Sequence, residues 1–557
     1  GTSLVGSTDG IVVDVTPPDV PTVTDDGQYF SDSHSIHARW TSRDNESGIA
    51  RYEYCVGTTA GGGDVKSWTS VGTSTEATAT GLSLTSGTVY YFSVRAINGI
   101  GLVSGVGSTD GITLDTTAPS TPAVTDEGTF TASTTGLNAS WTSADPESGI
   151  KAYKYAVGTT PGGTDARGWT NAGTATSMAI SGLSLNHNQI YYISVIATNG
   201  AGSDSPFGAA DGITVDATPP DRPVVTDDGD SQAALDNLHA SWTTADPESG
   251  ITKYEYSIGT APGTSDVFRW TDVGLSTSVT KTGLNLREAT VYYINVRATN
   301  RVGLVSEVGS SNGILIDSTP PPAPVVSDEG NFTASIDSLH AYWTSVNTPS
   351  GVAYYDYSIG TAAGLTDVKG WTTAGLTNEV VATGLTLTDG HVYFINVRAI
   401  SNVGKEGYVG SSDGITIDAT PPSTPTVTDG GAFAASTTEL AASWSSTDDQ
   451  SGIALYEYAV GATSGGTDIR DWTSAGAATS LTIGSLSLVD GGTYYISVRA
   501  TNGANAKSAV GTSDGITIDM TPPSQPIVTD DGAFTTETRR GSLHAAGPPR
   551  PLCKRAW

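Results

Sequence analysis

Apolar and polar residues alternate along several short stretches of the chain. Ile36, Ala38 and Trp40 alternate with His37 and Arg39, and a period of two places the three apolar side chains on one face of a strand. Residues 52–56 and 90–96 alternate in the same way. We interpret these stretches as half-buried β-strands with one face toward solvent.

Clusters of turn-forming residues separate the predicted strands. Examples are Asp25-Asp26-Gly27, Glu46-Ser47-Gly48 and the glycine-rich run from Ala60 to Asp64, whose residues favour tight turns. About seven short strands fit between such turns in each 100-residue stretch, and no segment has a sustained helical period. The pattern predicts an all-β fold, an antiparallel sandwich of two sheets.

The whole strand pattern repeats along the chain. The tripeptide Asp-Gly-Ile begins at positions 9, 110, 211, 413 and 514, always 101 residues or twice that apart, and Asn312 fills the missing place. A unit of this length can bury its own core, so a fixed period indicates autonomous domains in tandem. Function must therefore be argued for one repeat and then multiplied.

Proline-rich junctions mark the expected domain limits. Five whole repeats are predicted at 17–117, 118–218, 219–319, 320–420 and 421–521, preceded by a last-strand remnant at 1–16 and followed by an incomplete repeat at 522–557. After Thr538 the chain becomes basic and loses the repeat pattern. We interpret that tail as a frame error or a truncated gene model rather than a basic binding tail, and assign it no function.

Each repeat resembles the fibronectin type III domain. The features that carry the resemblance are the opening prolines, Trp40, Gly48-Ile49, Tyr52, Gly81-Leu82, Leu84 and the segment 90–98. The resemblance implies a tandem array of seven-stranded Greek-key, immunoglobulin-like β-sandwiches, of the kind found in large bacterial or archaeal-type surface or secreted proteins. The repeats depart from the family in a longer first loop and in the glycine-rich segment before Trp68. The resemblance implies no particular chemistry.

The composition limits the partners of the chain. It has 26 Lys and Arg against 57 Asp and Glu, a net charge of −31, which argues against nucleic acid or anionic lipid because both require a basic surface. There is no apolar run of membrane-spanning length, so no membrane insertion is expected within this chain. Its two cysteines, Cys55 and Cys553, are not equivalent positions and provide no disulfide framework.

No catalytic constellation is visible, and we predict that the chain is not an enzyme. The glycine-rich segments lack the Gly-Lys-Ser/Thr ending of a phosphate-binding loop, and no Gly-x-Ser-x-Gly elbow stands between a strand and a helix. His37, His239 and His340 are equivalent positions on a polar strand face and are interpreted as surface residues. The arginines at 95, 297, 398 and 499 are expected to pair with acids across strands.

Acidic residues form the one candidate ligand site. In the sandwich topology, the first loop of one repeat, the linker and the second-to-third-strand loop of the next repeat converge on each junction. The predicted groups are Asp25, Asp26, Asp115, Asp145 and Glu147 at the first junction, and Asp126, Glu127, Asp216, Asp246 and Glu248 at the second. Calcium takes six to eight oxygen ligands and suits such a cluster; solvated turn residues are the alternative.

The fourth repeat provides an internal contrast for this site. Asn347 and Pro349 replace both loop acids there, and Asn312 replaces an aspartate before its junction. If calcium matters, the junction of repeats 3 and 4 should be the weakest. No cofactor is required by the sequence, and calcium is the single candidate ion.

A second recurring residue has two interpretations. The tryptophans in question are Trp68, Trp169, Trp270, Trp371 and Trp472. They either pack in a hairpin, as large aromatics usually do, or lie exposed and stack on sugar rings.

The leading functional hypothesis is a structural and interaction segment, a spacer or adhesion stalk, of a large extracellular or cell-surface protein. Short proline-stiffened linkers favour a semi-rigid array, with other surface proteins or glycans as partners. The alternative is the accessory, carbohydrate-contacting portion of an extracellular polysaccharide-degrading enzyme whose catalytic domain lies outside this chain.

Overall fold

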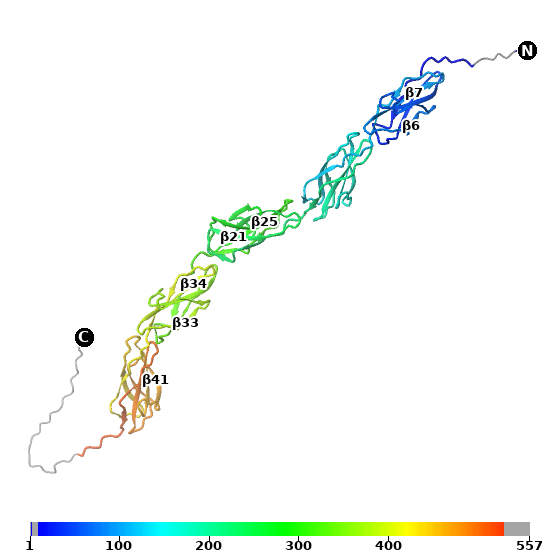
Figure 1. Ribbon diagram of the computed structural model, residues 1–557. Coiled ribbons are helices and arrows are strands. Elements are labelled where there is room, and N and C mark those ends of the chain that lie inside the picture. Colours follow the sequence, from blue (N-terminus) through cyan, green and yellow to red (C-terminus); the bar gives the residue numbers. More distant parts are fainter. Residues whose placement is uncertain (1, 3–8, 528–557) are drawn as a thin grey trace, which may run out of the picture. The chain divides into compact units, whose positions relative to one another are not determined.

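The computed structural model describes residues 2 and 9–527, and every regular element in that range is a β-strand (Figure 1). The first repeat shows the arrangement. Its smaller sheet holds β1 (Thr22–Asp25), β3 (Ser35–Thr41) and β6 (Glu76–Thr80), in the order β1-β3-β6. Its larger sheet has the order β2-β9-β7-β4-β5, with β8 also paired to β7; these strands are β2 (Tyr29–Phe30), β4 (Ile49–Gly57), β5 (Lys66–Ser70), β7 (Val89–Asn98), β8 (Gly107–Ser108) and β9 (Ile112–Leu114).

The nine strands are the seven of the predicted sandwich with two of them interrupted. The first strand leaves the small sheet after Asp25, turns at Gly27 (φ 126°) and continues as β2 in the large sheet. The last strand is broken at Gly111 (φ 103°) into β8 and β9. All pairs are antiparallel except β2 with β9, which run parallel. The predicted Greek-key sandwich is confirmed.

The same nine strands recur in the second and third repeats. In repeat 2 they are β10 (Ala123–Asp126), β11 (Phe130–Thr131), β12 (Gly136–Thr142), β13 (Ile150–Gly158), β14 (Arg167–Gly173), β15 (Ser177–Ser181), β16 (Ile190–Asn199), β17 (Gly208–Ala209) and β18 (Ile213–Val215). In repeat 3 they are β19 (Val224–Asp227), β20 (Ser231–Gln232), β21 (Asn237–Thr243), β22 (Ile251–Gly259), β23 (Phe268–Asp272), β24 (Ser278–Thr282), β25 (Val291–Asn300), β26 (Gly309–Ser310) and β27 (Ile314–Ile316).

The fourth and fifth repeats keep this order. Repeat 4 holds β28 (Val326–Asp328), β29 (Phe332–Thr333), β30 (Ser338–Trp343), β31 (Val352–Gly360), β32 (Lys369–Gly375), β33 (Glu379–Thr383), β34 (Val392–Ser401), β35 (Gly410–Ser411) and β36 (Ile415–Ile417). Repeat 5 holds β37 (Thr426–Asp429), β38 (Phe433–Ala434), β39 (Leu440–Ser445), β40 (Ile453–Gly461), β41 (Arg470–Gly476), β42 (Ser480–Ile483), β43 (Thr493–Asn502), β44 (Gly511–Thr512) and β45 (Ile516–Ile518).

Each repeat has its own hydrophobic core between its two sheets. In the first repeat the alternating residues of β3, β4 and β7 meet there, and Trp40 is 2% exposed. Its ring stacks on Phe92 with centroids 5.9 Å apart, and Phe92 stacks on Tyr54 at 4.8 Å. Such aromatic packing stabilises a domain without disulfides.

The chain divides into two compact units, residues 1–319 and 320–557. This division falls at the predicted limit between repeats 3 and 4. In the first unit, residues 9–15 form no strand, and Ile11, Val12 and Val13 are exposed. The incomplete repeat beyond residue 527, with its basic tail, lies outside the described residues.

Candidate functional site

The aspartate that ends one repeat is buried among residues of the next. The main-chain NH of Asp115 donates to the carbonyl of Phe30 in its own repeat (2.9 Å). Its side chain, 0% exposed, instead accepts hydrogen bonds from Ser148 Oγ (2.5 Å) and Asn199 Nδ2 (2.7 Å) of repeat 2. One residue therefore belongs to two sandwiches.

The loop between β12 and β13 positions the partners of Asp115. Asp145 Oδ1 accepts from the main-chain NH of Glu147 (3.2 Å) and Ser148 (2.9 Å), a local turn that aspartate favours. Asn199, the last residue of β16, donates to Asp145 Oδ2 as well as to Asp115 Oδ2. We call Asp115, Asp145, Ser148 and Asn199 the junction clamp.

The same contacts are made at two other junctions, one in each compact unit. At the second junction Asp216 accepts from Ser249 and Asn300, and at the junction of repeats 4 and 5 Asp418 accepts from Ser451 and Asn502. Asp14 makes the same contacts with Ser47 and Asn98.

The two carboxylates of the clamp and one further acid gather at positions that the sequence predicts. One oxygen from each of Asp115, Asp145 and Glu147 lies within 4.8 Å of the others, and Asp216, Asp246 and Glu248 form the same group at the second junction. Burial alone would raise the pKa of Asp115, but hydrogen bonds from Ser148 and Thr117 outweigh it and hold the pKa below its ordinary value. These residues could hold a divalent cation, and calcium stays a prediction.

The first-loop acids have other partners. Asp25 accepts from the NH of Gly27 (3.2 Å), and Asp26 pairs with His37 (2.9 Å) on the outer face of β3. Similarly, Asp126 accepts from Gly128, and Glu127 accepts from Asn138. The three-carboxylate groups of the described chain contain none of these four acids, so this half of the predicted site is not assembled. The topology places these loops at one pole, but each side chain turns to partners within its own repeat.

The structure adds a contact that the sequence argument missed. It joins two consecutive repeats. One residue lies in the loop before the β7-type strand of the earlier repeat, and the other is the residue of the later repeat that is equivalent to Glu147. His187 Nε2 lies 3.3 Å from Glu248 Oε1, whereas Asp389 Oδ2 accepts from Gln450 Nε2 (3.0 Å). Where the later repeat carries a glutamate, the earlier repeat offers a histidine. Where the later repeat carries a glutamine, the earlier repeat offers an aspartate. Comparing the residues at these two positions from repeat to repeat could have revealed the pairing.

The recurrent tryptophans lie half-buried on the outer face of the large sheet, mostly beneath arginines. Guanidinium carbons of Arg95, Arg297, Arg398 and Arg499 sit 4.3–4.6 Å from the ring centroids of Trp68, Trp270, Trp371 and Trp472. The same arginines pair with acids on the neighbouring strand, as predicted.

Repeat 2 lacks this cover. Ile196 stands in place of the arginine and Lys154 in place of the acid, and Trp169 is 39% exposed. Trp169 is therefore the ring of the set that is open to a ligand.

Comparisons with known proteins give a sequence relative and similar solved structures. No protein-family model matches the chain. Over 305 residues the chain is 28% identical to Exoglucanase B of Cellulomonas fimi, a match that covers 53% of this chain and 25% of that protein. The chain thus spans about a quarter of the length of this relative.

Two solved structures are similar to it. The tetra-tandem repeat in the extending region of a large adhesion protein is 20% identical, with a TM-score of 0.32, and the match covers 72% of this chain and 100% of that one. The FN1–FN3 domains of chicken CNTN1 are 17% identical, with a TM-score of 0.21 and coverage of 53% and 97%.

The sheets β1-β3-β6 and β9-β7-β4-β5 form the two layers of a β-sandwich, the architecture that the sequence resemblance implies. The repeats are fibronectin type III-like sandwiches. Within the described part of these fibronectin type III-like repeats, no helix is long and apolar enough to cross a bilayer.

Proposed function

We propose that the array is a non-catalytic spacer of a large extracellular or cell-surface protein, in which consecutive repeats within each compact unit are docked rather than loosely tethered. The observation that carries this proposal is the junction clamp. A buried aspartate that bonds its own repeat through the main chain and the next repeat through the side chain resists reorientation, because any rotation leaves buried polar groups without partners.

The linkers support the same function. Segments such as Thr116-Thr117-Ala118-Pro119 are short and contain proline, which restricts the backbone. Copying such a docked unit extends reach without adding chemistry. An extracellular setting fits the low cysteine use and the acidic surface, and other surface proteins or glycans are the expected partners.

The test is small-angle X-ray scattering of the full chain, comparing wild type with a variant that carries Asp115→Ala, Asp216→Ala and Asp418→Ala. A charge-matched control replaces the exposed Asp211, Asp413 and Asp514 by alanine. We expect greater flexibility in the first variant alone. Superimposable curves for all three proteins would reject docked junctions.

A second candidate rests on the exposed Trp169 and on the likeness to an exoglucanase. In this version the array is an accessory segment of a polysaccharide-degrading enzyme, and repeat 2 contacts glycan through Trp169. Trp169→Ala should abolish glycan-array binding while Trp270→Ala, whose ring lies under Arg297, should not. Equal binding by both variants would remove this candidate.

A further inference from the structure

Repeat 3 exchanges two residues that the other repeats keep. At the start of the β5-type strand the other repeats carry a basic residue, and near the end of the β6-type strand they carry a buried aliphatic one. The pairs are Lys66 with Ala79, Arg167 with Ile180, Lys369 with Ala382 and Arg470 with Ile483. Repeat 3 has Phe268 and Lys281 instead.

In repeats 1, 2 and 5 the basic residue closes the gap between the two sheets. Arg167 Nη2 donates to the carbonyls of Ser181 (2.7 Å) and Gly182 (3.2 Å), at the end of the edge strand β15. Arg470 bonds the equivalent carbonyls in repeat 5. The side chain therefore spans from the edge of the large sheet to the edge of the small one.

In repeat 3 this bridge is gone. Phe268 turns inward and stacks on Tyr256 with ring centroids 5.5 Å apart. Lys281 pairs with Leu238 at a position whose side chain faces the core in the other repeats. It is only half-buried, and its Nζ lies 4.4 Å from the centroid of the Phe268 ring. No side chain among the described residues donates to the carbonyls of Thr282 or Gly283. A cavity of about 600 Å³ opens between β23 and the chain following β24, which we call the repeat 3 groove.

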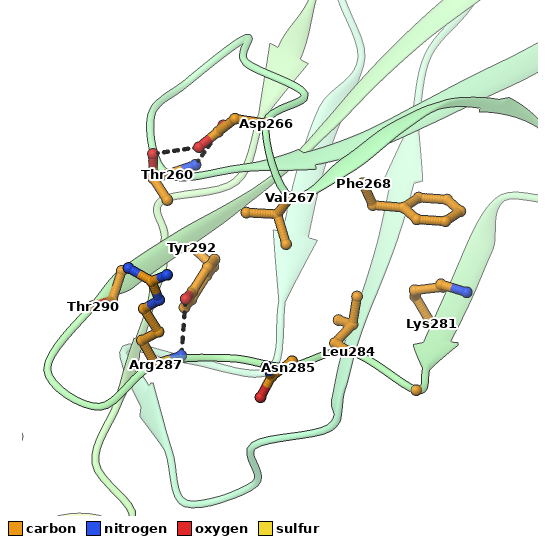
Figure 2. A pocket seen from close by; sticks show the side chains of 11 residues that line it. Thr260, Asp266, Val267, Phe268, Lys281, Leu284, Asn285, Arg287, Thr290 and Tyr292 are labelled. Atoms are coloured by element: carbon orange, nitrogen blue, oxygen red, sulfur yellow. Dashed lines mark hydrogen bonds between the residues drawn. The ribbon is translucent and has the colours of Figure 1, made fainter.

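The lining of the repeat 3 groove combines apolar and cationic groups (Figure 2). Val267 and Leu284 point toward each other at its centre, with Arg287 at one end and Lys281 at the other. Arg287 is also particular to this repeat, because the equivalent residues are Thr85, Asn186, Thr388 and Val489. In the described chain neither Lys281 nor Arg287 forms an ion pair, so both charges are available to a ligand.

One acid and one amide complete the lining. Asp266 accepts from Thr264 Oγ1 (2.7 Å) and from the hydroxyl (2.8 Å) and NH (3.0 Å) of Thr260, and these bonds lower its pKa to about 2. It stays anionic and can accept further hydrogen bonds from hydroxyl groups. Asn285 adds a donor and an acceptor. A ligand that satisfies this set needs hydroxyls as well as negative charge.

We propose that the repeat 3 groove binds an acidic saccharide, a short run of carboxylated sugar units. Arg287 and Lys281 receive carboxylates at the two ends, arginine through paired N–H donors. Val267 and Leu284 support the apolar face of a ring, and the carbonyls released at Thr282 and Gly283 accept sugar hydroxyls. The cavity is of the size that small ligands occupy. This activity goes beyond the spacer function and does not depend on the junction clamp.

The test is calorimetric titration of the full chain with a galacturonate hexamer, in the presence of chelator so that calcium cannot bridge. A neutral galactose oligomer and a hexaglutamate peptide are the comparison ligands. The decisive variant is Phe268→Arg with Lys281→Ile, which gives repeat 3 the pair that repeat 2 already folds with. Arg287→Thr likewise uses the residue of repeats 1 and 4.

We expect the galacturonate hexamer to bind, with at least tenfold loss in either variant and unchanged thermal unfolding. Hydrogen exchange should show protection confined to residues 260–292. Equal binding of the neutral oligomer or of hexaglutamate, binding that survives the double variant, or no binding of galacturonate would each overturn the proposal.

Discussion

The junction between repeats 1 and 2 and the junction between repeats 4 and 5 share one clamp but differ in the charges around it. Both bury an aspartate that accepts from a serine and an asparagine of the following repeat. The first adds Glu147 and has Ser86 at the position of Asp389, while the last has Gln450 and Asp389. The first junction thus carries three carboxylates, and the last carries four: Asp418, Asp448, Asp449 and Asp389.

The arrangement changes the ionisation of the shared aspartate. Burial acts to raise the pKa of Asp115, but hydrogen bonds from Ser148 and Thr117 overcome it and lower that pKa. Burial raises the pKa of Asp418, and the negative charges of Asp448 and Asp389 add to the effect. The hydrogen-bonded clamp is therefore the constant part of the junction, and the acids around it vary.

The largest effect is expected from removing the shared aspartate. Asp115→Ala leaves Ser148 Oγ without its acceptor and Asn199 with one fewer, and Asp418→Ala does the same at the other junction. Each should destabilise the following repeat by about 2–3 kcal/mol, the cost of stranding buried polar groups.

Hydrogen exchange on the full chain locates this loss. Protection should fall in repeat 2 for Asp115→Ala and in repeat 5 for Asp418→Ala. The controls Asp211→Ala and Asp514→Ala, exposed aspartates of the same repeats, should change little. Loss confined to the repeat that contributes the aspartate would contradict the clamp.

Exchanging the variable residues should have a smaller, asymmetric effect. Gln450→Glu replaces the hydrogen bond to Asp389 with like-charge repulsion, so repeat 5 should lose about 1 kcal/mol. Glu147→Gln removes a carboxylate near Asp115 and should be close to neutral. Thermal unfolding followed by hydrogen exchange measures both; a loss of equal size in the two variants would show that the facing residue is irrelevant.

The two aspartates should respond to pH in opposite directions. The pKa of Asp418 is raised in the folded chain above its ordinary 3.8, so its stabilising contribution is fullest below that pH and is lost as pH rises through the folded value. Asp115, with a lowered pKa, contributes above pH 3.8 and loses this as pH falls.

Aspartate-to-asparagine variants isolate these contributions. As the pH falls from 7 to 3, the free energy of unfolding of the wild type should increase relative to that of Asp418→Asn. It should decrease relative to that of Asp115→Asn. Denaturant unfolding at several pH values gives both slopes. Parallel slopes would contradict the opposite pKa directions of Asp418 and Asp115.

The smallest effect is expected from calcium. The group of Asp115, Asp145 and Glu147 offers three carboxylates within 4.8 Å, whereas Gln450 replaces the glutamate at the last junction. At a calcium concentration near a millimolar Kd, repeat 2 should gain about 0.4 kcal/mol, and repeat 5 should gain less. Hydrogen exchange in calcium and in chelator measures this; no gain in repeat 2 would mean that Ser148 and Asn199 already satisfy the acids.

Much of the fold could be predicted because its signals are local. Alternation around Trp40 and the 101-residue period gave the sandwich and its copies, since strand periodicity and core burial are properties of short segments. The pairing of Asp115 with Asp145 and Glu147 followed from topology. Asp25 and Asp26 did not follow, because their side chains bond Gly27 and His37 within their own repeat. The repeat 3 groove depends on two exchanged residues, and a pattern built on what the repeats share cannot reveal it.

Because of the clamp, the repeat seen in the sequence differs from the set of residues that complete one folded domain. A repeat cut at its prolines begins after the aspartate that its own serine and asparagine require. In chain order that aspartate precedes its partners, and its main-chain NH donates to a carbonyl of the preceding domain. A copied repeat that lacks the preceding aspartate therefore leaves its own serine and asparagine without that acceptor.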